Sequence, residues 1–313
     1  MTSLYDFGKD ELGVALNQHV RLTHPFPRIW AIQPYSEIYP RTAGPIQPRS
    51  ARTNVELIIQ AMRIMAARGD IQTVVWDGFT NTARAIKNEV AQKGTNKDES
   101  TKNMVTQWGS SKDSVLNMPG MNWRDYGMTQ DFMRFDFRNP ILAAPEPFHF
   151  LGLGHECLNE PEGEYGPDIG GPKGWNFAGG MFEFVLWMGR KGKDRMVATD
   201  DYQRGAFTAK ATFKRSPDTE VGDNGVVKIS DYASSVALWQ LAMDGSTTGL
   251  VRALLYGGYD VGKTALASAF LGVEGSGNAL FVMGDQQLGL ATCWPQAKAA
   301  TEPAKPKPNE AKA

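Results

Sequence analysis

Short apolar runs alternate along this chain with longer segments whose apolar residues recur every three or four positions. The runs Thr73–Asp77 and Ala279–Met283 have the length and composition of buried strands. In the segment Asn54–Arg68 the apolar side chains fall on one helical face, which predicts an amphipathic helix with Asn54 as its N-cap. Strands that alternate with helices in this way predict an α/β domain with a mainly parallel central sheet flanked by helices.

The same pattern places further elements in the rest of the chain. We expect strands over residues 148–153, 182–188, 195–199, 206–213 and 251–256, and helices over 79–91, 123–138, 230–243 and 265–271. Polar and irregular sequence predicts a loop over 92–121, and Gly- and Pro-rich sequence predicts another over 160–180. Residues 1–295 are therefore expected to form one domain. Residues 296–313, mostly Ala, Lys, Pro and Glu, are expected to form a disordered tail.

Charge and cysteine content narrow the class of protein. The net charge is −1, from 33 basic and 34 acidic residues, so the whole molecule has no general electrostatic attraction to nucleic acid. The two cysteines, Cys157 and Cys293, have no metal-ligand spacing and indicate a reducing compartment. No run reaches the ~18 apolar residues of a membrane span, and the N-terminus lacks a secretory signal pattern. We expect a cytoplasmic protein with no membrane partner.

The most specific motif is GGYDVGKT, residues Gly257–Thr264, which fits the phosphate-loop pattern G-x-x-x-x-G-K-[ST] at every fixed position. A predicted strand precedes it and a predicted helix follows it, as the motif requires. Backbone N–H groups of such a loop bind phosphate, Lys263 reaches the β- and γ-phosphates, and the Thr264 hydroxyl binds Mg²⁺. The competing interpretation is a glycine-rich turn with an incidental lysine, which the flanking elements disfavour.

The phosphate-loop unit spans residues 250–286. Its candidate nucleotide-binding residues are Gly257, Gly258, Tyr259, Asp260, Val261, Gly262, Lys263, Thr264 and Ala265.

Polar side chains also follow three other predicted strands, at Asp77, His155 and Asp285. Ligands of a parallel sheet bind at the carboxyl ends of its strands, so these residues and the phosphate loop are expected to surround one site. Asp77 is a candidate Mg²⁺ ligand, His155 could contact the γ-phosphate or the attacking water, and Asp285 could orient that water. The alternatives are a helix cap or turn for Asp77, a hydrogen-bonded loop histidine for His155, and a turn residue for Asp285.

Basic residues lie along the predicted strand over 206–213 and just after it. Lys210 and Arg215 could act on the phosphates of a neighbouring subunit, as an arginine finger does. A solvated strand face explains the same residues equally well.

Four stretches together resemble small phage-encoded RecA-like ATPases of the AAA type. They are LLYGGYDVGKTALASAF; TVVWDGFTNTARAI; WRDYG with FHFLGLGHE; and the run YGPDIGGPKGWNFAGGMFEFVLWM, RMVATD and AFTAKATFKR. Relatives place the phosphate loop first and the basic strand last, whereas here the basic strand precedes the loop. The chain therefore resembles a circular permutation of that family, which a fold tolerates when its original termini lie close together at the surface.

The resemblance implies a RecA-like P-loop core with permuted strand order that binds and hydrolyses ATP with Mg²⁺. It implies ATP phosphates on Gly257–Thr264, Mg²⁺ on Asp77 and Thr264, and a γ-phosphate sensor at His155. Asp285 takes the place of the water-activating Glu, and Lys210 and Arg215 act in trans.

The function implied is phage DNA recombination or single-stranded DNA handling, by a homo-oligomer in the host bacterial cytoplasm, with a single-strand-binding protein as a possible partner. The Gly-rich loop from Cys157 to Gly180 matches a DNA-contacting loop, where Trp175 or Phe177 could stack on bases. Three alternatives stay open: a non-hydrolysing nucleotide-binding switch, a P-loop small-molecule kinase with residues 94–120 as its lid, and a scaffold that has lost the chemistry.

Overall fold

The computed structural model describes most of the chain. The described residues are 4–32, 51–93, 104–108, 115–119, 123–159, 162–169, 180–192, 194–213, 221, 224–283 and 288–299.

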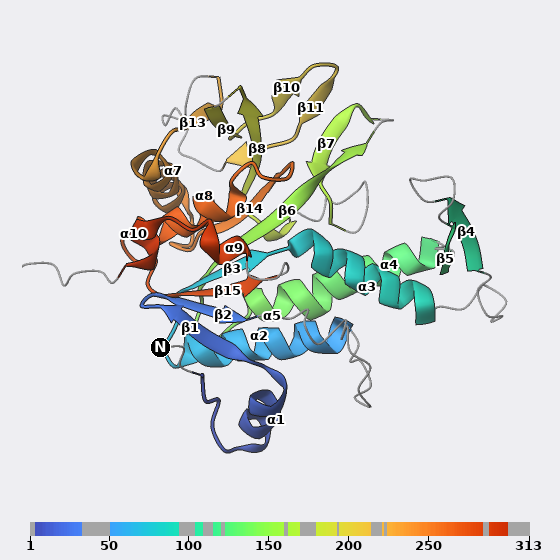
Figure 1. The fold of residues 1–313 in the computed structure, drawn as a ribbon, viewed down its shortest axis with the longest axis vertical. Helices are drawn as coiled ribbons and strands as arrows, with labels where there is room; N and C mark the ends of the chain where they lie inside the picture. The colour runs from blue at the N-terminus through green and yellow to red at the C-terminus, as the bar shows by residue number, and fades with distance from the viewer. Residues whose placement is uncertain are drawn as a thin grey trace, which may run out of the picture.

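A large sheet runs through the molecule (Figure 1), and its main strand order is β1-β2-β15-β3-β6-β14-β8-β9-β13. The bounds are β1 Leu22–Phe26, β2 Ile29–Ile32, β3 Thr73–Asp77, β6 His149–Asn159, β8 Phe184–Lys191, β9 Asp194–Ala198, β13 Val226–Ile229, β14 Arg252–Gly257 and β15 Ala279–Met283. All pairings from β2 to β8 are parallel, and antiparallel pairings occur at both edges. The prediction of an α/β fold with a mainly parallel sheet is confirmed.

The central strands are apolar throughout because helices cover both faces of the sheet. In β3, Val74 and Trp76 belong to one hydrophobic core while Val75 belongs to the other. Leu254 and Leu255 of β14 divide in the same way. This alternation follows from the two-residue repeat of a strand, which directs successive side chains to opposite faces.

Helices divide between the two faces of the sheet (Figure 1). On one face lie α2 (Ala51–Ala67), α3 (Phe79–Lys93), the π-helix η1 (Phe132–Arg138) and α5 (Asn139–Leu142), and α1 (Glu11–His19) and α4 (Trp123–Asp131) pack beside them. On the other lie α7 (Tyr232–Gly245), α8 (Lys263–Ala269), the 3-10 turn η3 (Phe270–Gly272) and α10 (Pro295–Lys298). The short helix α9 (Leu288–Ala291) precedes α10. Within the described ranges, no helix has the length and apolar character needed to cross a bilayer.

Three sequence predictions about local structure were wrong. Helix α2 begins at Ala51, so Asn54 lies inside the helix and is buried rather than capping it. The expected loop over 92–121 contains a hairpin of β4 (Met104–Trp108) and β5 (Val115–Pro119). The expected loop over 160–180 contains β7 (Glu164–Pro167), which pairs with the far end of β6. These strands are only four or five residues long and lie in polar or Gly- and Pro-rich stretches, so their local signals are weak.

The predicted strand over 206–213 is divided into β11 (Phe207–Ala209) and β12 (Thr212–Phe213). Strand β11 pairs with β10 (Tyr202–Arg204) and with β7, so these strands form an outer layer beyond the main sheet.

The boundary of the predicted tail also needs correction. Helix α10 includes residues 296–298, and its Ala297 is fully buried. Pro295 at the start of the helix has no N–H to satisfy, and small Ala297 fits against α8 and η3. The ordered domain therefore extends to residue 299, and residues 300–313 lie outside the described part.

Candidate functional site

The motif Gly257–Thr264 joins the end of β14 to the start of α8, as the sequence predicted. Gly262 caps the helix with φ 96°, a left-handed conformation that favours glycine. A Cβ at Gly257 would lie 2.2 Å from the carbonyl oxygen of Met188 on the neighbouring strand β8. Glycine is therefore required at both ends of the loop, by backbone conformation at one and by close strand packing at the other.

Lys263 folds back over this loop. Its Nζ donates to the carbonyl oxygens of Gly257 and Gly258, at 3.1 Å and 2.7 Å. Burial lowers the pKa of the Lys263 ammonium group, while the nearby carboxylates of Asp77 and Glu156 oppose that shift. A buried cation that is hydrogen-bonded to neutral carbonyls gains from a bound anion, because an anion offsets its lost hydration.

Asp77 and Thr264 meet although they are 187 residues apart in the chain. The Thr264 hydroxyl donates to Asp77 Oδ2 at 2.8 Å. Asp77 ends β3, and Thr264 lies in the first turn of α8, which follows β14; strands β3 and β14 flank β6 in the sheet. The sequence placed both residues at one Mg²⁺ site, and the structure brings them into direct contact.

The Asp77 carboxylate and the Thr264 hydroxyl can be compared with the ligands that different metal ions require. Within the described ranges, no group of three or more His, Cys, Asp or Glu side chains gathers in a way that could hold a metal. One carboxylate and one hydroxyl do not make a complete protein site for Zn²⁺ or Ca²⁺. They do fit Mg²⁺, which usually takes one or two protein oxygens and completes its shell with water and substrate phosphates.

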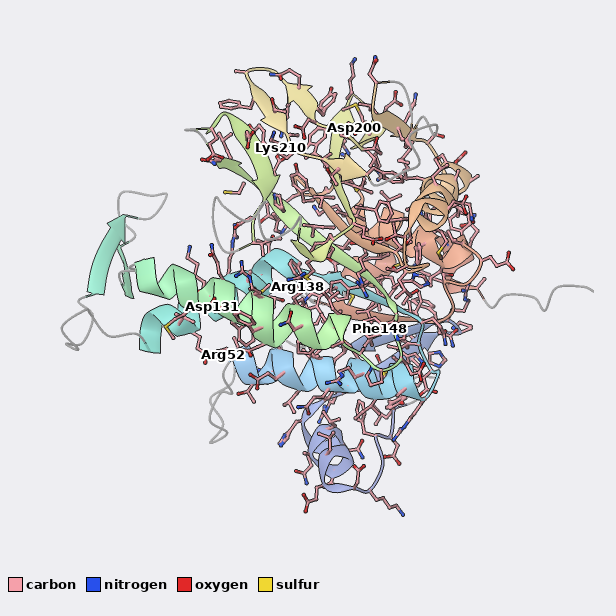
Figure 2. All side chains as sticks on the ribbon, turned by 180° about the vertical axis from the view of Figure 1, so that it is seen from behind. Arg52, Asp131, Arg138, Phe148, Asp200 and Lys210 are labelled. Carbon is pink, nitrogen blue, oxygen red and sulfur yellow. The ribbon has the colours of Figure 1, made fainter. Side chains whose placement is uncertain are left out.

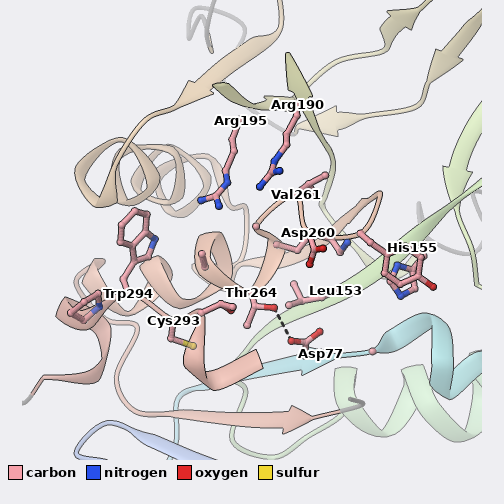
Figure 3. Close-up of a pocket in the computed structure, with 17 residues that line it drawn as sticks. Asp77, Leu153, His155, Arg190, Arg195, Asp260, Val261, Thr264, Cys293 and Trp294 are labelled. Carbon is pink, nitrogen blue, oxygen red and sulfur yellow. Dashed lines mark hydrogen bonds between the residues drawn. The ribbon is translucent and has the colours of Figure 1, made fainter. Parts of the chain in front are cut away.

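A cavity of about 990 Å³ opens along the phosphate loop (Figure 3). Asp77, Leu153, His155, Thr264, Cys293, Trp294 and Pro295 are among the residues that line it. In Figure 3, His155 lies at one end and Trp294 at the far end, with Thr264 and Asp77 between them. The other lining residues are Gly78, Arg190, Arg195, Tyr259, Asp260, Val261, Gly262, Lys263, Ala265 and Thr292. This volume is at the upper end of the range for small-molecule sites.

His155 lies on β6, which is the direct neighbour of both β3 and β14. Its ring packs on Tyr259 of the phosphate loop, with centroids 4.2 Å apart, and its backbone N–H donates to Thr80 Oγ1 at 2.8 Å. The structure thus places the phosphate loop, Asp77 and His155 around the same cavity.

Lys210 lies elsewhere, in the outer layer formed by β7, β10 and β11 (Figure 2). Its Nζ forms ion pairs with Glu164 and Asp201, both at 2.9 Å, and these carboxylates raise the pKa of the lysine. Lys210 is not among the residues that line the cavity. Its predicted action on a neighbouring subunit stays a prediction.

Four predicted residues fall outside the described part of the chain. They are Asp285, Arg215, Trp175 and Phe177.

Arg190, Arg195 and Trp294 are among the cavity-lining residues that sequence reasoning missed. Arg190 and Arg195 flank a short basic turn, RKGKDR, and two arginines beside a turn give no signal unless the turn is known to lie next to a phosphate loop. Trp294 is 30 residues beyond Thr264, and tryptophans are assigned to the core by default. Only the sheet order and the packing of α10 bring these residues to the site.

The chain was compared with protein-family models, curated proteins and solved structures, and none of them matches it.

Proposed function

We propose that this protein binds ATP with Mg²⁺ in the cavity above the phosphate loop and hydrolyses it. The observation that carries the proposal is the 2.8 Å contact between Thr264 and Asp77, beside Lys263. A chance match to the motif would give no reason for a distant carboxylate to meet its hydroxyl residue. That convergence is what phosphate-loop enzymes need, because the hydroxyl and the acid together position the metal ion.

Each group has a defined task in this proposal. Loop N–H groups and the Lys263 ammonium bind the phosphates, and the lysine exchanges its carbonyl partners for phosphate oxygens. Thr264 and Asp77 would hold Mg²⁺, which supplies positive charge against the charge that develops on the phosphates. His155, on the strand beside Asp77, is our candidate for contacting the γ-phosphate or the attacking water.

The far end of the cavity suits the nucleoside. The indole N–H of Trp294 is buried and has no hydrogen-bond acceptor among the described residues. Buried polar groups are almost always paired, so this N–H, in a residue that lines the cavity, would gain a partner if the ring turned toward an acceptor atom of a bound ligand. The Trp294 backbone N–H is anchored to Ser268 Oγ on α8 at 3.1 Å, which fixes this wall relative to the loop.

The strand order supports a permuted RecA-like core. β15, the last strand among the described residues, pairs with β2 on one side and β3 on the other. The two ends of the chain are thus interleaved within one sheet, as a rotated order requires. Assembly into a homo-oligomer and action on single-stranded DNA are proposed from the family resemblance.

The test is a binding and turnover assay on the full-length protein. We expect a fluorescent ATP analogue to bind with Mg²⁺, and phosphate release to be stimulated by single-stranded DNA. Lys263→Ala should abolish release without unfolding the domain, because the side chain mainly serves the ligand. Lys228→Ala is a matched control, since Lys228 is exposed and forms its ion pair with Asp194 on the neighbouring strand. Wild-type turnover by Lys263→Ala would contradict the assignment.

One observation favours a second candidate, a nucleotide-binding switch that does not hydrolyse ATP. The carboxylates that line the cavity within the described residues are Asp77 and Asp260. Asp77 already accepts from Thr264, and Asp260 lies on the loop itself. Tight binding of Mg²⁺ and ATP with no phosphate release, with or without DNA, would identify the switch.

A further inference from the structure

Arg190 and Arg195 form a pair across the hairpin of β8 and β9. They are direct partners in the antiparallel register, so both side chains leave the same face of the sheet. Like charges directly opposite each other on two strands destabilise the pair. Both residues nevertheless line the cavity above the phosphate loop. An anion between them would convert this repulsion into attraction.

The sheet holds this hairpin against the phosphate loop. Strand β8 pairs in parallel with β14, and Met188 lies opposite Gly257 in that register. Arg190 therefore lies two residues beyond Met188, where strand β8 passes the first glycine of the phosphate loop. A Cβ placed on Gly262 would lie 3.0 Å from Arg195 Nε and 3.1 Å from its Cζ, so the guanidinium rests on the last glycine of the loop. Figure 3 shows both arginine side chains extending from the hairpin toward the loop.

Two basic side chains on nearby strands have carboxylate partners. Arg204 pairs with Glu156 at 2.9 Å, and Lys228 pairs at 2.7 Å with Asp194, the residue next to Arg195. In the part of the chain that the structure describes, no carboxylate lies within ion-pair distance of Arg190 or Arg195.

Among the described residues that line the cavity, positively charged side chains therefore outnumber negatively charged ones. Arg190, Arg195 and Lys263 face the carboxylates of Asp77 and Asp260. Asp77 is the proposed metal ligand, so its charge would be offset by Mg²⁺ when the site is loaded. The remaining excess of positive charge fits a ligand with several negative charges.

We propose that Arg190 and Arg195 bind phosphate groups of the nucleotide from the same chain that carries the loop. This inference rests on the proposed function and adds that the arginines that bind the phosphates belong to the same chain as the phosphate loop. A guanidinium offers a planar fork of donors that matches two phosphate oxygens, which a lysine cannot do. Phosphate binding then needs no basic residue from a second subunit, in contrast to the trans role predicted for Lys210 and Arg215.

The experiment measures the affinity for inorganic tripolyphosphate, by displacement of a fluorescent ATP analogue in the presence of Mg²⁺. Arg190→Ala and Arg195→Ala should each weaken tripolyphosphate binding about tenfold or more, the effect of losing a charge-assisted hydrogen bond. The double variant should lose more, and Arg→Lys variants should recover only part of the loss. Arg134→Ala is the matched control, because Arg134 is exposed on η1 on the other face of the sheet.

Ligand-free stability provides the second measurement and separates binding from folding. If the arginines repel each other, each Ala variant should unfold at the same urea concentration as wild type or a higher one. Tripolyphosphate should then protect wild type more than the double variant.

The outcomes distinguish this inference from the proposed function. Wild-type protein that binds neither ATP nor tripolyphosphate overturns both. If Lys263→Ala loses binding while the double arginine variant keeps wild-type affinity, only the arginine assignment fails.

Discussion

Replacing Asp77 with Asn tests whether the carboxylate at the end of β3 acts on a metal ion. In the structure the Thr264 hydroxyl donates to Asp77 Oδ2 at 2.8 Å. The amide oxygen of Asn takes nearly the same position and can still accept this hydrogen bond, so the contact between β3 and α8 is kept. The substitution removes the negative charge, which attracts Mg²⁺ and repels free phosphate.

The affinity for Mg²⁺ in the presence of ATP should fall about 10- to 100-fold, the usual loss when a group that supports a metal site is replaced. That factor corresponds to about 1.4–2.7 kcal/mol. ATP affinity in EDTA should stay the same or rise, because a carboxylate near the phosphates has been removed. Titration of a fluorescent ATP analogue at several Mg²⁺ concentrations, and in EDTA, measures both quantities.

Asp260→Asn is the matched control for this experiment. Asp260 lines the same cavity and the substitution removes the same charge, but its side chain is exposed on the loop. Its φ of 56° is a conformation that Asn also tolerates. The control should keep the wild-type Mg²⁺ dependence. An unchanged Mg²⁺ dependence in Asp77→Asn, or an equal loss in both variants, would refute the metal assignment.

Three further predictions concern stability and the nucleoside end of the cavity. Burial lowers the pKa of His149 from 6.5 to about 4, so the unfolded state binds a proton before the folded state does as the pH falls. Urea unfolding should therefore show a free energy of unfolding about 2 kcal/mol lower at pH 5 than at pH 7. The variant His149→Gln should remove most of this difference. Gly257→Ala should lower the free energy of unfolding by about 2 kcal/mol or more, because the new Cβ would lie 2.2 Å from the carbonyl oxygen of Met188. Gly127→Ala, whose Cβ would have nothing within 4 Å, should not destabilise the protein in the same urea unfolding experiment. ATP should change the tryptophan fluorescence of wild type, and a Trp294→Phe variant that gave the same change would exclude Trp294 from the nucleotide site.

Much of the main sheet could be predicted from the sequence. Strands β3 and β15 have the predicted bounds, because a fully buried strand in a parallel sheet is apolar along its whole length. Strands outside the main path of the sheet were predicted less well. Strands β4, β5 and β7 are only four or five residues long and lie in stretches rich in polar and turn-forming residues, so their local signal is weak.

The chain's own sequence determined the chemistry that acts over a few residues: the glycines of the loop, Lys263 and Thr264 beside them, and an acid at the end of an apolar strand. Turn conformation and strand burial are local demands, so they leave local patterns. Only the tertiary structure decided that Asp77 meets Thr264, that Arg195 rests on Gly262, and that Trp294 closes the far end of the cavity. Those contacts depend on the order and register of the strands, which are set by how the two cores pack together over the whole sheet.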